Sequence, residues 1–303
     1  MNEIKNLALQ NKIKLPKNVR IAEVGPRDGL QNEAKVLTPE FKINLIESLV
    51  NAGVKHVEVG SFVSPKWVPQ MASTELILEK LNFKPGVTYS VLVPNLKGVE
   101  MAVKTKANEY AVFTAASESF CKKNINCTID ESIDKFLPII QLAKENNVKV
   151  RGYVSCVMGC PYEGEIDPKI VNKVAERLLE IGCYEVSLGD TIGIGTPEKT
   201  ELLLNAVKVP VDKLAVHFHD TAGTALENLL VALSRGIAVI DSSVGGLGGC
   251  PYAKKGVGNV ATERVIEMLE YLGIETGINL PELKKVGKYA TKELDREITY
   301  LFE

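Results

Sequence analysis

The feature that most constrains this fold is an alternation of short β-branched runs with longer segments of helical period. Eight runs are predicted to be buried strands: 19–25, 56–62, 87–93, 109–115, 148–156, 184–190, 214–220 and 238–246. The helix-period segments that alternate with them are 38–53, 72–81, 95–106, 130–147, 167–182, 196–208, 224–236 and 259–273. Eight strand–helix units are what a closed barrel requires, so we predict an α/β fold, a (β/α)8 TIM barrel with short N- and C-terminal additions. A doubly wound open sheet is the alternative, but it usually has fewer strands and a glycine-rich turn after the first.

Helix boundaries support this division of the chain. Thr38, Asp167 and Thr196 each stand before a proline, which is typical of a capping residue followed by the first helical position. Gly53 and Gly182 are predicted to end two helices. We expect a single domain over 1–303, with a barrel core over about 19–273 and a C-terminal helical cap over about 278–303.

Composition excludes several classes of protein. The chain has 303 residues, 45% of them hydrophobic, and a net charge of −2, so it offers no broad basic field and we expect no nucleic-acid partner. It has no apolar run long enough for a membrane span, so we expect no membrane partner. The six cysteines form no CxxC pair, and the N-terminus lacks a secretory signal. We therefore expect a cytoplasmic protein with free thiols.

Polar residues gather where the predicted strands end. In such a barrel the chemistry lies at the C-terminal ends of the strands, and unpaired buried charge is costly. The polar residues near these ends are Glu23, Arg27, Asp28, Glu58, Arg151, Ser187, Asp190, His217, His219, Asp220 and Asp241. This concentration of charge predicts an active site.

Two of the three histidines, His217 and His219, are two residues apart in one short apolar run. On a strand they point to the same face, which is the geometry of paired metal ligands, and Phe218 points into the packing. The alternative is two core histidines with ordinary hydrogen bonds. Asp28 and the amide of Asn259 would add oxygen ligands, and a mixed nitrogen and oxygen site suits Mg²⁺ or Mn²⁺, with Zn²⁺, Fe²⁺ or Co²⁺ as substitutes.

Two further segments carry candidate catalytic groups. Arg27 precedes Asp28 just after the first predicted strand, where it could stabilise a developing oxyanion; the alternative is a surface ion pair in a turn. Cys250 lies in the glycine-rich segment 245–259 after the last predicted strand. We interpret its thiol as a proton donor or acceptor carried by a loop, against the alternative of a small buried hydrophobe.

Six motifs together resemble the 3-hydroxy-3-methylglutaryl-CoA lyase family, in the right order over about 19–273. They are VGPRDGLQNE, SFVSPKWVPQMA, RGYVSCVMGCPYEG, LGDTIGIGTP, VHFHDTAGTALEN and GGLGGCPYAKKGVGNVATE. RDGLQ and HFH are similar to a wider superfamily of metal-dependent barrel lyases and acyl-condensing synthases. The Cys250 loop and SFVSPKWVPQM resemble the lyases specifically.

The resemblance implies divalent-metal-dependent cleavage of (S)-3-hydroxy-3-methylglutaryl-CoA to acetyl-CoA and acetoacetate, as in leucine degradation and ketone body metabolism. It implies Asp28, His217, His219 and Asn259 as metal ligands. It implies Arg27, Asp28, Glu58, His217 and Cys250 as catalytic residues. Substrate-binding residues would be Arg27, Gln31, Arg151, Ser187 and Asp190. The partner would be the acyl-CoA substrate, and by analogy we expect a homodimer.

The chemistry leaves some alternatives open. Either His217 or Asp28 could take the proton of the 3-hydroxyl, while Arg27 would stabilise the enolate oxygen and Cys250 would reprotonate the carbanion. A lyase for a longer branched 3-hydroxyglutaryl-CoA, a condensing synthase and a barrel that only binds its ligand remain as alternatives. Ala34 stands where many relatives have a lysine, and the C-terminal segment differs from the basic tail of animal relatives, so the contacts to CoA are not predicted.

Overall fold

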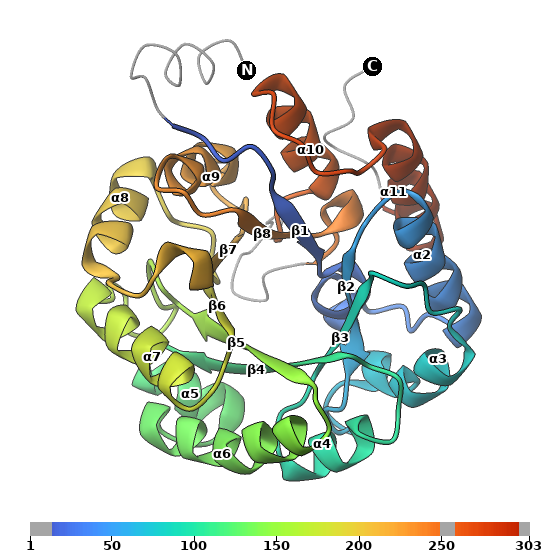
Figure 1. Cartoon of the computed structure of the whole chain (residues 1–303), viewed down its shortest axis with the longest axis horizontal. Helices are drawn as coiled ribbons and strands as arrows, with labels where there is room; N and C mark the ends of the chain where they lie inside the picture. The colour runs from blue at the N-terminus through green and yellow to red at the C-terminus, as the bar shows by residue number, and fades with distance from the viewer. Residues whose placement is uncertain (1–13, 249–257, 297–303) are drawn as a thin grey trace.

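A closed parallel barrel forms the centre of the protein. The computed structural model describes residues 14–248 and 258–296 (Figure 1). The strands pair in chain order from β1 to β8, and β8 closes the ring on β1. Their bounds are β1 Arg20–Glu23, β2 His56–Ser61, β3 Thr88–Leu92, β4 Glu109–Ala115, β5 Lys149–Ser155, β6 Glu185–Asp190, β7 Leu214–Phe218 and β8 Val239–Ser242. Each lies within one of the predicted runs, so the (β/α)8 prediction is confirmed.

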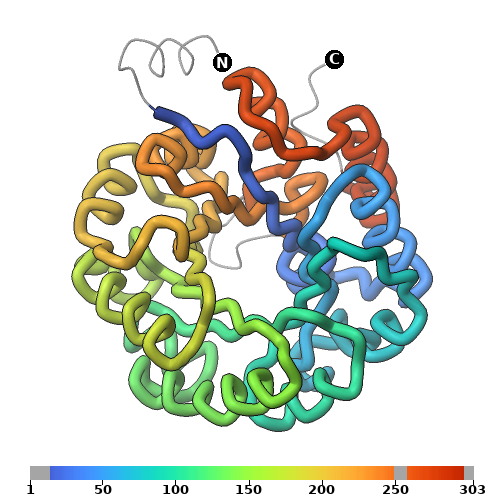
Figure 2. The backbone as a smooth tube through the Cα atoms, in the orientation of Figure 1, coloured from blue at the N-terminus to red at the C-terminus, as the bar shows by residue number. Residues whose placement is uncertain are grey.

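Helices surround the barrel as an outer layer (Figures 1 and 2). Their bounds are α2 Pro39–Asn51, α3 Thr74–Lys80, α4 Leu96–Ala102, α5 Glu118–Ile125, α6 Ile129–Glu145, α7 Pro168–Glu180, α8 Pro197–Ala206, α9 Ala225–Ser234, α10 Thr262–Tyr271 and α11 Leu280–Glu293. Helix α5 was not predicted, because it is short and most of its residues are polar. Helix α11 lies in the stretch predicted as a cap, beside α10 and α2.

The predicted helix ends are confirmed by hydrogen bonds and backbone angles. The side chains of Thr38, Asp167 and Thr196 each accept a hydrogen bond from a backbone N–H in the first turn of α2, α7 and α8. Gly53 and Gly182 have φ angles of +105° and +117°, which favour glycine, directly after α2 and α7. Every helix within 14–248 and 258–296 is too short or too polar to cross a bilayer.

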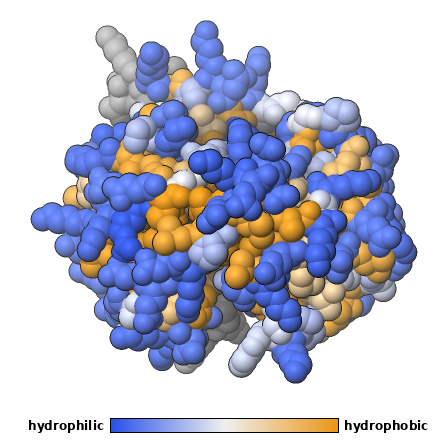
Figure 3. All heavy atoms as spheres, turned by 60° about the horizontal axis from the view of Figure 1, so that its bottom comes forward, coloured by the Kyte–Doolittle hydropathy of each residue, from blue (hydrophilic) through white to orange (hydrophobic). Residues whose placement is uncertain are grey.

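The two sides of the barrel wall differ in chemistry. Apolar strand residues such as Val57 and Val186 belong to the main hydrophobic core, which also includes helix residues. The interior carries charged side chains instead: Arg151 is fully buried, and its Nε donates to Glu185 Oε1 at 2.7 Å. Arg20, at the start of β1, also contacts Glu185. The outer surface is mostly hydrophilic on the face shown in Figure 3, with scattered apolar patches.

Candidate metal centre and active site

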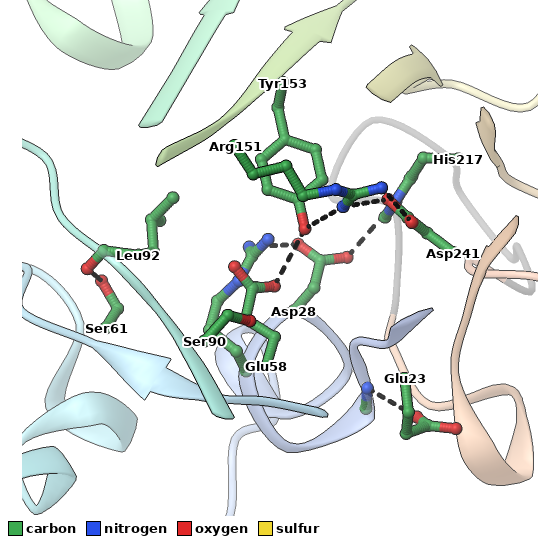
Figure 4. A network of polar contacts seen from close by, with 12 residues as sticks. Glu23, Asp28, Glu58, Ser61, Ser90, Leu92, Arg151, Tyr153, His217 and Asp241 are labelled. Carbon is green, nitrogen blue, oxygen red and sulfur yellow. Dashed lines mark hydrogen bonds and ion pairs between the residues drawn. The ribbon is translucent and has the colours of Figure 1, made fainter. Parts of the chain in front are cut away.

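The site is built from residues at or just beyond the C-terminal ends of the strands. Arg27 and Asp28 lie in a π-helical turn, Gly25–Gly29, directly after β1, and such turns recur at functional sites. Glu58 comes from β2 and His217 from β7. Figure 4 shows the side chains of Asp28, Glu58 and His217 converging from different segments of the barrel. The C-terminal ends of the strands are the expected place for chemistry in a barrel of this kind.

Asp28, His217 and His219 form a group that could hold a metal ion. One ligand atom from each lies within 4.8 Å of the others. The Nδ1 atom of His219 is buried and has no hydrogen-bond partner among the residues that the structure describes. Phe218 is fully buried, as predicted, so the two imidazoles share one face. A buried nitrogen without a partner is costly unless something binds it, so these residues fit a metal.

The protonation states of His219 and Asp28 also suit a metal ion. Burial and the neighbouring His217 lower the pKa of His219 to about 4, so its imidazole is neutral at pH 7. Burial alone would raise the pKa of Asp28, but the charge of Arg27 and then that of His217 outweigh it and hold the carboxyl ionised. A neutral imidazole and a carboxylate are the forms that bind metals.

Asn259 meets the site through its amide nitrogen. Nδ2 donates to Asp28 Oδ2 at 2.8 Å and to the carbonyl oxygen of Leu247 at 3.2 Å. A ligand role for this residue requires its oxygen to face the site, which a half-turn of the amide group brings about. The structure therefore brings Asn259 to the predicted place, with the other end of the amide facing Asp28.

Arg27 is a buried residue of the site. Its side chain is 8% exposed, Nε donates to Glu58 Oε2 at 2.7 Å, and one terminal nitrogen donates to Asp28 Oδ1 at 2.6 Å. The alternative of a surface ion pair is therefore wrong. Burial raises the pKa of Glu58 although Arg27 opposes it. Glu58 Oε1 has no hydrogen-bond partner within the described part of the chain.

The remaining predicted residues take different positions. Arg151 and Ser187 are fully buried and both donate to Asp241. Asp190 is also buried and accepts a hydrogen bond from the backbone N–H of Gly195 at 2.7 Å, within the loop after β6. Gln31 is half-buried at the end of the turn that carries Arg27. Cys250 lies outside the described residues.

Tyr153 is a site residue that the sequence analysis did not single out. Its hydroxyl accepts a hydrogen bond from Arg151 at 2.9 Å and lies 3.5 Å from Glu58 Oε2. Its ring meets the His217 ring edge-on, with centroids 6.1 Å apart. The signal was present in the sequence, because residues two apart on a strand share a face and Arg151 was already a candidate.

Comparison with known proteins agrees with this geometry. A family model described as HMGL-like matches residues 18–289. The chain belongs to the HMGL-like family. It is 54% identical to the mitochondrial hydroxymethylglutaryl-CoA lyase of Macaca fascicularis, over 93% of this chain and 88% of that protein. It is equally 54% identical to the 3-hydroxy-3-isohexenylglutaryl-CoA/hydroxy-methylglutaryl-CoA lyase of Pseudomonas aeruginosa, over 90% and 92%.

A solved structure of the HMGL-like family has the same fold. The crystal structure of hydroxymethylglutaryl-CoA lyase from Pseudomonas aeruginosa superposes with a TM-score of 0.92 at 53% identity. The match covers 93% of this chain and 95% of that one. The whole described barrel, rather than one motif, therefore places the chain in the HMGL-like family.

Proposed function

We propose that this protein is a divalent-metal-dependent lyase that cleaves (S)-3-hydroxy-3-methylglutaryl-CoA to acetyl-CoA and acetoacetate. The observation that carries the proposal is the convergence of Asp28, His217 and His219 beside the buried Arg27, in a chain 54% identical to lyases named for this substrate. A binding-only barrel has no need of a buried guanidinium next to three metal-binding groups, because burying such charges is costly.

The reaction assigns a task to each group. Bound Mg²⁺ or Mn²⁺ would act as a Lewis acid that makes the 3-hydroxyl of the substrate more acidic. His217 or Asp28 takes the hydroxyl proton, the carbon–carbon bond breaks, and its electron pair passes to the thioester enolate. Arg27 stabilises the enolate oxygen, and the Cys250 thiol donates a proton to the carbanion to give the acetyl methyl group.

We assign supporting tasks to the other predicted residues. Glu58 holds the Arg27 guanidinium through the 2.7 Å contact to Nε. Gln31 and Arg27 contact the substrate, whereas the burial of Arg151 and Ser187 gives them an indirect task through Asp241. Asp190 supports the site by holding the loop after β6.

The test is an assay of purified protein with the substrate and Mg²⁺ or Mn²⁺, with and without a chelator. We expect acetoacetate and acetyl-CoA at about one turnover per second or faster, with loss of both products when the metal is removed. Product formation that survives exhaustive chelation would overturn the metal dependence. Cleavage of a longer branched 3-hydroxyglutaryl-CoA in preference to this substrate would overturn the acyl-chain assignment, and condensation without cleavage would favour a synthase.

Metal identity, assembly and compartment belong to the same proposal. We assign Mg²⁺ or Mn²⁺ as the working ion, a homodimer as the assembled form and the cytoplasm as the compartment. Five cysteines of the described residues are free and buried, which suits a reducing compartment. Light scattering coupled to gel filtration tests the dimer, and metal analysis of protein purified without added metal tests the ion.

A further inference from the structure

Asp241 lies beside His217 in the barrel wall and has no assigned task in the reaction. The two residues are paired in the register of β7 and β8. Asp241 Oδ2 lies 3.4 Å from His217 Nδ1, and it is the only hydrogen-bond partner of that ring within the described residues. On the other side of the ring, His217 Nε2 lies 3.8 Å from Asp28 Oδ2.

We propose that Asp241 is a positioning residue for the metal centre. A carboxylate can only accept hydrogen bonds, so His217 Nδ1 must carry the proton, and the lone pair of Nε2 is then left facing Asp28. Imidazoles that bind metals commonly donate their second nitrogen to a carboxylate, which fixes both the tautomer and the ring orientation. The inference rests on the metal site of the proposed function.

Asp241 is itself held in one orientation. Arg151 donates to both of its oxygens, at 2.7 Å to Oδ1 and 3.0 Å to Oδ2, and Ser187 donates to Oδ2 at 2.8 Å. A bidentate pair with arginine restricts the plane of the carboxylate as well as its position. Figure 4 shows Arg151 lying along Asp241, with His217 next to it.

Arg151 has a second carboxylate partner toward the opposite end of the barrel. Arg151 Nε donates to Glu185 Oε1 at 2.7 Å, and Arg20 contacts the same carboxylate. Glu185 begins β6, Arg151 lies within β5 and Asp241 lies within β8. These contacts pair residues of β5, β6 and β8 inside the barrel, and Asp241 is the member of the group that lies against His217.

A purely structural role is the rival explanation, in which Asp241 only balances the charge of Arg151. The two explanations differ in what Asp241→Asn changes. If Asp241 only balances charge, the substitution lowers the stability of the fold and leaves metal binding unchanged. If Asp241 positions His217, the substitution also weakens metal binding. Glu185→Gln is the matched control, because Glu185 is an equally buried partner of the same arginine and has no contact with His217 among the described residues.

The measurement is the affinity of the protein for Mn²⁺. Titrations monitor free Mn²⁺ by its electron paramagnetic resonance signal, and circular dichroism checks that each variant is folded. We expect Asp241→Asn to raise the Mn²⁺ Kd by roughly 10- to 100-fold. Glu185→Gln should lower the unfolding temperature and leave the Kd near that of the wild type. Ser187→Ala keeps every charge and removes one donor to Oδ2, so it should raise the Kd by a smaller factor and also serves if Asp241→Asn does not fold.

The outcomes separate this inference from the proposed function. An unchanged Kd in folded Asp241→Asn, or in folded Ser187→Ala if the first variant does not fold, overturns the positioning role, as does an equal loss of affinity in Glu185→Gln. Wild-type protein that binds no Mn²⁺ overturns the metal site itself. Wild-type protein that binds Mn²⁺ but does not cleave the substrate overturns the proposed reaction. The role of Asp241 is then decided by the Mn²⁺ titrations of the variants alone.

Discussion

Glu23 illustrates how one strand-end carboxylate can serve the frame of the barrel instead of the reaction. It ends β1, is fully buried, and accepts hydrogen bonds from the backbone N–H groups of Gly25 and Val244 and from the Thr262 hydroxyl. These partners lie up to 239 residues away in the chain. Glu23 thus ties the turn that carries Arg27 and Asp28 to the segments that follow β8.

The pKa of Glu23 predicts a pH dependence of stability. Burial raises this pKa from 4.5 to about 7, so the folded protein holds the proton more tightly than the unfolded chain. The contribution of Glu23 to the free energy of unfolding is complete below about pH 4.5 and is lost as the pH rises through about 7. This is a change of about 3 kcal/mol. Glu23→Gln should remove this part of the pH dependence, measured by urea unfolding at several pH values. The exposed Glu79→Gln is the control, and an unchanged pH profile in Glu23→Gln would contradict the prediction.

Replacing Cys250 should change turnover without changing metal binding. Because a proton donor typically contributes 10²- to 10⁴-fold, Cys250→Ala should lower turnover by about that factor. Metal binding should persist, since the proposed ligands are untouched. Steady-state kinetics together with a Mn²⁺ titration checks both parts, and ordinary turnover in this variant would rule out the proton-donor role.

Helix α11 packs closely against Glu263, a residue that holds the turn after β8. A Cβ at Gly287 would lie 2.0 Å from Glu263 Oε1. That carboxylate accepts hydrogen bonds from the backbone N–H of Gly245, at 3.0 Å to each oxygen, in the short turn Val244–Gly246. A side chain at residue 287 would therefore displace Glu263 from the turn after β8.

Gly287→Ala should accordingly destabilise the protein, although alanine is the better helix former by about 1 kcal/mol. We expect a net loss of roughly 1–3 kcal/mol in the free energy of unfolding, as is usual for overpacking. Denaturant unfolding measures this loss. The neighbouring exposed position provides a control, because Lys288→Ala changes the same helix without a clash. A stability equal to or above that of the wild type would show that Glu263 yields without cost.

The metal centre should couple to the stability of the whole molecule, because its ligands come from segments far apart in the chain. Asp28 follows β1, whereas His217 lies within β7. In the proposed function the folded protein binds the ion, whereas the unfolded chain has no assembled site. Mn²⁺ at 100 times its Kd should therefore stabilise the fold by about 2.7 kcal/mol, or roughly 4 °C in Tm. Calorimetry with and without a chelator checks this, and His219→Ala should abolish the shift. A shift that persists in His219→Ala would place the stabilising ion elsewhere.

The sequence alone determined the barrel and predicted the main members of the candidate site. Strands and helices differ in local periodicity, so the alternation of eight runs with helical segments could be recognised without any contact. The spacing of His217 and His219 identified a shared face for the same reason.

The tertiary structure decided which distant groups meet. It paired Arg27 with Glu58 and buried both, turned Arg151 toward Asp241, and brought Tyr153 to His217. It also turned the amide nitrogen of Asn259 toward Asp28. These partners lie on different strands and become neighbours only when the barrel closes, because closure sets the register that places each side chain at its level in the interior.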